Sequence, residues 1–119
     1  MFKVSFYEKD SGESPVRNLL DSLRRQAATS KDARVHLNKI TAYIDLLSEY
    51  GTWIGEPVTK HLEGEVWELR PLDNRILYFF AKGNAYILLH HFEKKTQQTP
   101  RREIEQAKRE MKDYLERNA

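Results

Sequence analysis

The feature that most constrains this fold is a change in hydrophobic period near Pro57. Before it, apolar residues recur every three or four positions, as they do along one face of a helix. After it they recur at every second position, as along a strand, through several segments that end at Phe92. The helical period then returns. A chain with this order packs helices on one small sheet, which predicts the α+β class.

A strand and two helices are predicted in the first half of the chain. Residues 2–7 alternate apolar and polar side chains, which is the pattern of a half-buried strand. A helix begins at Ser14-Pro15, because serine caps helices and proline is favoured at the first helical position. A second helix begins near Ser30 and ends at Gly51.

Three or four strands and a last helix follow. The segments PVTKHL and EVWELR flank a tight turn at 63–64, and RILYFFA and AYILLHHF flank another at 82–84. The final helix follows Thr99-Pro100, again a cap followed by proline. The order β-α-α-β-β-β-β-α therefore predicts a single domain over residues 1–119. Its small twisted sheet is expected to be antiparallel, with the helices packed on one face.

The composition excludes several kinds of site. There is no cysteine, so disulfides, cysteine metal sites and thiol nucleophiles are excluded. The four histidines are scattered, and no glycine-rich phosphate loop or Gly-x-Ser-x-Gly turn is present, so we predict neither metal nor cofactor. No apolar run approaches the roughly 18 residues that a membrane span needs. No signal peptide is evident, which predicts a cytoplasmic protein.

Basic residues gather near the C-terminus, although the net charge of the chain is only +2. From Lys94 to Lys112, seven basic residues stand against three acidic ones. A local basic patch of this kind attracts polyanions even in a nearly neutral protein. The alternative is a solvated helix face.

Polar residues of neighbouring strands are expected to share one face of the sheet. Glu68 and Arg70 point to the same side of their strand, whereas Trp67 and Leu69 point to the other side and should be core. Arg75 begins the next strand and belongs with the first pair. A solvated ion pair is the alternative for Glu68 and Arg70, and a turn contact is the alternative for Arg75.

The last strand ends in two histidines and two lysines. His90 and His91 point to opposite faces, so only one of them can join the polar face, while Lys94 and Lys95 lie just beyond the strand. Such a histidine can equally be a structural residue. Together these groups predict a basic face that suits a phosphate backbone. The aromatic side chains that could stack on bases, should they line that face, are Trp53, Tyr78, Tyr86 and Phe92.

The segments WELRPLDNRILYFF and YILLHHFEKKTQQTP, with the following REIEQA, resemble the HigB-like, phage-related branch of the RelE/ParE toxin superfamily. The resemblance covers essentially the whole chain and implies a RelE-like fold. It also implies the toxin of a bacterial type II toxin–antitoxin system, a ribosome-dependent mRNA endoribonuclease that is neutralised by a HigA-like helix-turn-helix antitoxin. The alternatives are a toxin that poisons DNA gyrase, as a sister branch does, and a non-catalytic nucleic-acid-binding module.

Metal-free RNA cleavage needs a base for the 2′-OH, a cation for the transition state and an acid for the departing 5′-oxygen. Arg75 and Arg70 match basic residues of the family. They suit the second task, because a guanidinium group meets phosphate oxygens bidentately and stays charged. Glu68 is the candidate base. His90, which matches the histidine of the family motif, is the alternative base or acid.

The basic residues after the last strand are assigned to substrate binding. Lys94 and Lys95 match the basic pair of the family and are expected to hold the backbone of mRNA or ribosomal RNA. Lys95 is also a candidate for protonating the leaving group. Arg101 and Arg102, at the start of the last helix, extend the same surface.

The chain departs from the family pattern in two places. The best-known members carry strand lysines where this chain has Val66 and Glu68. Their tyrosine near the start of the last helix has no counterpart in TPRREIEQA. The acid–base assignments of those members therefore do not transfer to this chain.

Overall fold

The computed structural model describes all of residues 1–119, and its elements follow the predicted order. The α+β class is confirmed, with three α-helices, one short 3₁₀ helix and a sheet of five strands. In chain order the elements are β1 (Lys3–Phe6), α1 (Pro15–Gln26), α2 (Lys31–Tyr50), η1 (Gly51–Ile54), β2 (Thr59–Glu63), β3 (Val66–Leu69), β4 (Asn74–Ala81), β5 (Ala85–Glu93) and α3 (Arg101–Arg117).

The sheet is mixed, with the strand order β1-β5-β4-β3-β2. The last four strands form the predicted antiparallel meander. β1 instead lies parallel to β5, with Lys3 opposite Ala85 and Phe6 opposite Leu88. The prediction of a wholly antiparallel sheet is therefore wrong. A parallel pair needs a long connection, and here the two helices and the rest of the sheet supply it.

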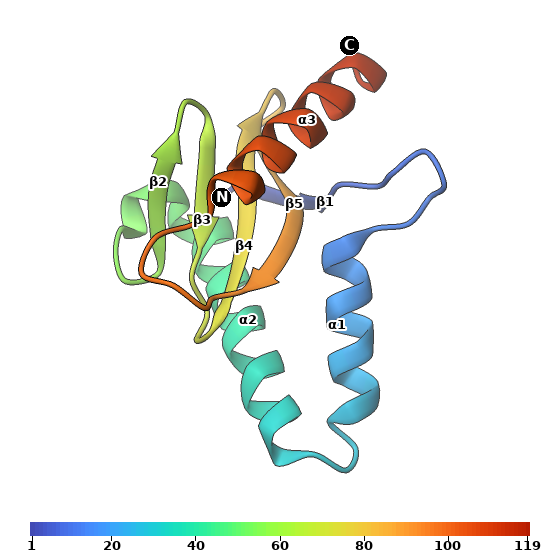
Figure 1. Cartoon of the computed structure of the whole chain (residues 1–119), viewed down its shortest axis with the longest axis vertical. Coiled ribbons are helices and arrows are strands. Elements are labelled where there is room, and N and C mark those ends of the chain that lie inside the picture. The colour runs from blue at the N-terminus through green and yellow to red at the C-terminus, as the bar shows by residue number, and fades with distance from the viewer.

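The helices cover both faces of the sheet, so the prediction that they pack on one face is wrong. Figure 1 shows α3 crossing in front of the strands while α2 passes behind them. On the α1–α2 side, Ile76 and Tyr78 belong to one core cluster, and on the α3 side Leu77 and Phe79 belong to another. β4 is apolar on both of its sides, and a strand of that kind needs cover on both.

The predicted helix caps have three different outcomes. The Ser30 hydroxyl accepts a hydrogen bond of 3.1 Å from the Ala33 N–H and caps α2 as predicted. Ser14 occupies the cap position of α1, but its side chain makes no cap bond. The cap position of α3 is Pro100 and not Thr99, so that prediction is wrong. None of the helices has the length and apolar character required to cross a membrane.

Candidate functional site

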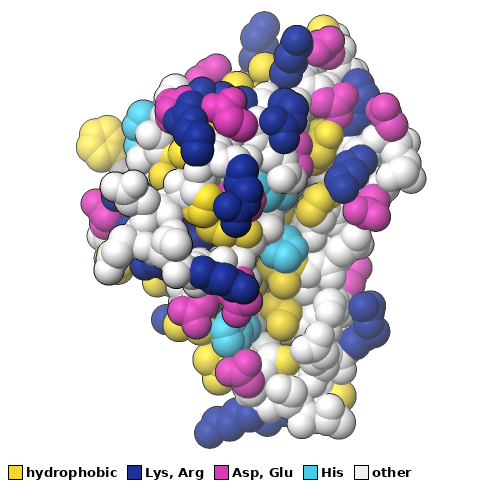
Figure 2. All heavy atoms as spheres, viewed as in Figure 1, with side chains coloured by type: hydrophobic (Ala, Val, Ile, Leu, Met, Phe, Trp, Pro, Cys, Tyr) yellow, Lys and Arg dark blue, Asp and Glu magenta, His cyan; other side chains and the backbone are white.

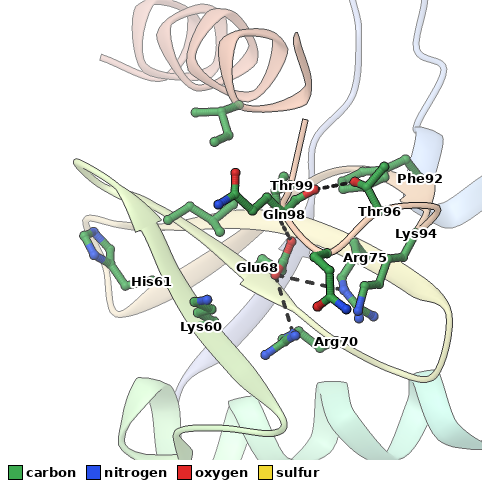
Figure 3. Close-up of a pocket in the computed structure, with 13 residues that line it drawn as sticks. Lys60, His61, Glu68, Arg70, Arg75, Phe92, Lys94, Thr96, Gln98 and Thr99 are labelled. Atoms are coloured by element: carbon green, nitrogen blue, oxygen red, sulfur yellow. Dashed lines mark hydrogen bonds and ion pairs between the residues drawn. The ribbon is translucent and has the colours of Figure 1, made fainter. Parts of the chain in front are cut away.

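Basic and acidic side chains are interspersed over the face of the molecule that carries α3 (Figure 2). A pocket of about 240 Å³ opens on this side of the sheet. Residues 94–100, which we call the strap, connect β5 to α3 and supply one wall of the pocket (Figure 3). The polar residues that line it are Lys60, His61, Glu68, Arg70, Arg75, Lys94, Thr96, Gln97, Gln98 and Thr99.

Glu68 of β3 lies at the centre of the polar contacts in the pocket (Figure 3). It is only 3% exposed. The Thr99 hydroxyl donates a hydrogen bond of 2.6 Å to its Oε1 atom. Its Oε2 atom lies 3.6 Å from Arg70 Nε and 4.0 Å from Arg75 Nε. The structure therefore brings together the predicted carboxylate and both predicted arginines, and it engages both carboxylate oxygens.

Arg75 is held by the turn that precedes its own strand. Its Nη1 group donates hydrogen bonds to the backbone carbonyls of Leu72, at 2.7 Å, and Asn74, at 2.8 Å. The side chain is buried, and burial lowers the pKa of its guanidinium group, while the charge of Glu68 acts in the opposite direction. An arginine stays charged under these conditions because its ordinary pKa is so high. Arg75 is therefore a fixed cation at the pocket.

Arg70 follows β3 and is less enclosed than Arg75. Its Nη1 group donates to Glu56 Oε1 at 3.1 Å. Its Nε atom is buried and has no hydrogen-bond partner. A buried donor without a partner is costly in the free protein, and a bound anion would satisfy it.

Two lysines complete the positive lining of the pocket. Lys94 belongs to the strap, and Lys60 lies directly opposite Glu68 in the pairing of β2 with β3. Four cationic side chains therefore line the pocket against one carboxylate. Lys60 was not among the residues singled out in the sequence, although the turn predicted at 63–64 already brings its strand beside that of Glu68.

Three predicted binding residues lie outside the pocket. Lys95 faces a shallow hollow beside it. Arg101 forms ion pairs with Glu63 and Glu105. Arg102 is 80% exposed in its side chain and approaches only a neighbouring carboxylate of α3, at 3.5 Å. Their roles in binding RNA or the ribosome stay predictions.

His90 lies between β5 and α3 and does not line the pocket. Its Nδ1 atom is 2.6 Å from Glu110 Oε1, and its Nε2 atom is 3.0 Å from Glu103 Oε1. Burial by itself lowers the pKa of His90, but the two carboxylates outweigh burial and raise it. Because a carboxylate only accepts, both ring nitrogens donate and the ring is cationic. Neither nitrogen is free for a substrate, which favours a structural role for His90 over acid–base chemistry.

The two carboxylates that hold His90 were not singled out in the sequence. Glu103 and Glu110 are seven residues apart on α3, which places them on the same face of the helix as the buried Ile104 and Ala107. Acidic residues on an apolar stripe are a signal that a buried cation faces them.

Only one of the four candidate stacking residues lines the pocket, namely Phe92. Tyr78 and Tyr86 belong to the core cluster on the opposite face of the sheet. Trp53 is 94% exposed on η1 and is not part of the pocket lining. Stacking of a base within the pocket could therefore use Phe92 alone among these four.

Comparison with known protein families shows where this chain belongs. The model of the family described as phage-derived protein Gp49-like (DUF891) matches residues 27–112, a range that contains the whole pocket lining. This family is RelE-like and toxin-like, so the match agrees with the resemblance to RelE-type toxins that the sequence shows. The HigB-like branch stays a prediction. No curated protein matches the chain.

Proposed function

Because the chain belongs to the phage-derived Gp49-like family, which is toxin-like, we propose that it is the toxin of a type II toxin–antitoxin system. Its activity in this proposal is metal-independent cleavage of mRNA on the ribosome. The observation that carries the proposal is the pocket in which Arg70 and Arg75 meet at Glu68, with Lys60 and Lys94 beside them. This concentration of positive charge suits the phosphate of an RNA backbone.

The proposed reaction is attack of a 2′-oxygen on the neighbouring phosphorus. The P–O5′ bond breaks, so the products are a 2′,3′-cyclic phosphate and a 5′-hydroxyl. Negative charge builds up on the phosphate oxygens in the transition state, and fixed cations stabilise it without having to reorganise. Arg75 is such a cation because backbone carbonyls hold it in place. Removing one preorganised donor of this kind costs about 3–4 kcal/mol in other enzymes.

To assign proton transfer, we set aside the side chains whose polar atoms already contact other protein groups. Both oxygens of Glu68 and both ring nitrogens of His90 contact protein groups. Lys94 lines the pocket, and we assign to it the donation of a proton to the leaving 5′-oxygen. The 2′-hydroxyl loses its proton to hydroxide from solvent, so no side chain acts as the base in this proposal. Electrostatic stabilisation by the two arginines is then the main catalytic contribution.

The proposed partner is an antitoxin of the helix-turn-helix type, encoded beside this chain. A toxin-like family suggests such a partner, because a free toxin would arrest the growth of its own host. Co-expression of the neighbouring open reading frame should restore growth, and the two products should purify together.

The test of the proposed activity is induced expression in bacteria, followed by primer extension on a long-lived message. Wild-type protein should produce discrete cuts in that message, and a copy of the message without a start codon should stay intact. Arg75→Lys keeps the charge but loses the planar fork, so its cuts should become at least about a hundredfold weaker. Arg25→Ala removes an exposed arginine of α1 and serves as the matched control.

One result would argue against the ribonuclease, and another would argue only against the role of Arg75. Growth arrest without cuts would point to a protein target such as DNA gyrase. Cuts of equal strength in wild type and Arg75→Lys would remove Arg75 from the site. Thermal unfolding of each variant establishes that it is folded.

A further inference from the structure

Thr99 forms an unexpected bond. A threonine before a proline at the start of a helix is well suited to cap that helix. Here α3 has no side-chain cap, and the Thr99 hydroxyl donates to Glu68 Oε1, 31 residues away in the sequence, at 2.6 Å. The side chain therefore serves the pocket instead of the helix.

The strap that carries this hydroxyl is fixed at both ends. At its start, the Lys94 N–H donates to the Asp73 carbonyl at 2.7 Å, which ties it to the turn between β3 and β4. At its end, the Glu103 N–H donates to the Pro100 carbonyl at 3.0 Å, and the Glu103 side chain is held by His90. The threonine hydroxyl between these ends is therefore held in place at the pocket.

The second oxygen of Glu68 faces two guanidinium groups at once. Oε2 is 3.6 Å from Arg70 Nε and 4.0 Å from Arg75 Nε. Two cations this close repel each other, and a carboxylate between them offsets that repulsion and fixes their separation. Its orientation depends on Thr99, whose hydroxyl is the only group within hydrogen-bond distance of the Glu68 side chain.

We propose that Thr99 is a positioning residue of this site: its hydroxyl orients Glu68, and Glu68 aligns Arg70 and Arg75 for one phosphate group. Glu68 then acts as the counter-ion of the arginines and not as a general base. The catalytic consequence rests on the proposed function, but the alignment of the arginines can be measured without it.

Two substitutions separate the hydroxyl from the shape of the side chain. Thr99→Val has nearly the same shape and lacks the hydroxyl, whereas Thr99→Ser keeps the hydroxyl. In reconstituted translation with a defined message, Thr99→Val should lower kcat about tenfold to a hundredfold, because small misplacements of catalytic groups have effects of that size. KM should change much less, since the lysines still bind the backbone. Thr99→Ser should restore most of kcat.

The pH dependence of kcat distinguishes this role from general base catalysis. If Glu68 only positions the arginines, Thr99→Val should lower the whole profile and keep its shape. If Glu68 is the base, removal of its hydrogen bond should move the acidic limb of the profile. A moved limb would overturn the counter-ion role.

A measurement on the free protein keeps this proposal separate from the proposed function. Arginine Nε–Hε signals in NMR spectra report how firmly each guanidinium group is held. In Thr99→Val the signals of Arg70 and Arg75 should shift and exchange faster with water, and in Thr99→Ser they should stay close to wild type. Unchanged signals in Thr99→Val would overturn the proposal. Changed signals in a protein that cuts no RNA would uphold the positioning and refute the ribonuclease.

Discussion

His90 carries its charge between two carboxylates and so ties the stability of the protein to pH. The groups that face it are Glu103 and Glu110 of α3. The next residue of β5, His91, points to the other side of the sheet, and burial and the charge of His90 lower its pKa. Tyr7 lies near Glu110 and stays neutral, because burial and a hydrogen bond to a carboxylate raise its pKa to about 12. Among these groups, His90 is the one whose charged form is favoured by folding, because the two carboxylates raise its pKa.

The sign of the pH effect follows from the direction of the shift. The pKa of His90 is raised above its ordinary value of 6.5 in the folded protein, so its contribution is fully present below pH 6.5. It is lost as pH rises through the raised pKa. We expect the free energy of unfolding, measured with urea, to fall in that window by at most about 1.4 kcal/mol per pH unit.

The variant His90→Gln should lack this slope, since it has no proton to release. His61→Gln replaces an exposed histidine on β2 and should keep the slope. If wild type and His90→Gln lose stability in parallel, the pH dependence has another source.

Strand alternation suffices to predict that Glu68 and Arg70 share a face, because side chains two positions apart point the same way. Arg75 begins the next strand, and its place beside them depends on the register of that strand, in which Leu77 lies opposite Glu68. Alternation cannot reveal the role of Thr99. The choice between capping a helix and binding a carboxylate depends on a distance across the fold, and both uses need the same hydroxyl in the same local sequence.

At the scale of elements, the end of α2 is fixed by a glycine that has little room. Gly51 has φ of +63°, a conformation that side chains disfavour. A Cβ atom there would lie 2.7 Å from the Tyr86 hydroxyl and 2.9 Å from the Phe2 ring. The same hydroxyl accepts a hydrogen bond of 3.2 Å from the Thr52 N–H. At Gly51, η1, β5 and the N-terminal segment are therefore packed closely against one another.

Gly64 provides a matched comparison for Gly51. Its φ is +56°, but a Cβ atom there would meet nothing within 4 Å. We expect Gly64→Ala to cost about 1–2 kcal/mol, from backbone strain alone. Gly51→Ala should cost about 2–5 kcal/mol, because overpacking adds to the same strain. Denaturant unfolding of both variants measures the difference, and equal losses would mean that the surroundings of Gly51 yield easily.

The order of the elements could be predicted because each has a strong period, from the apolar stripe of α2 to the alternation in β3. The pairing of β1 could not be predicted. It has only four residues and an alternating pattern, and such a strand fits beside any partner in either direction. The segment RILYFF did indicate that both faces of β4 are buried, because its apolar residues follow one another without alternation.

At the scale of the whole molecule, the net charge is too small to attract RNA, so the attraction has to come from a local group of positive charges. The net charge is +2, and charges of both signs are interspersed over the face that carries α3 (Figure 2). The excess of positive charge lies in the pocket. The affinity for RNA should therefore fall with salt concentration only as steeply as a few phosphate contacts require.

Salt titrations of binding to a short single-stranded RNA test this. Each phosphate neutralised adds about 0.7 to the slope of log K against log salt concentration, so Lys94→Ala should reduce the slope by about that amount. Lys31→Ala removes an exposed lysine at the start of α2 and should leave the slope unchanged. Fluorescence anisotropy of the labelled RNA measures the binding. Equal slopes for wild type and Lys94→Ala would mean that the RNA binds elsewhere on the protein.

The parallel pairing of β1 with β5 has a consequence for how the protein is made. A ribosome synthesises β1 before its partner, residues 85–88, which is made only after α1, α2 and most of the sheet. Thr99 and α3 come later still. Long-range pairings of this kind close late in folding. A nascent chain therefore carries an incomplete pocket until Thr99 and α3 have been made, and the ribosome that makes it is not exposed to an assembled site before that point.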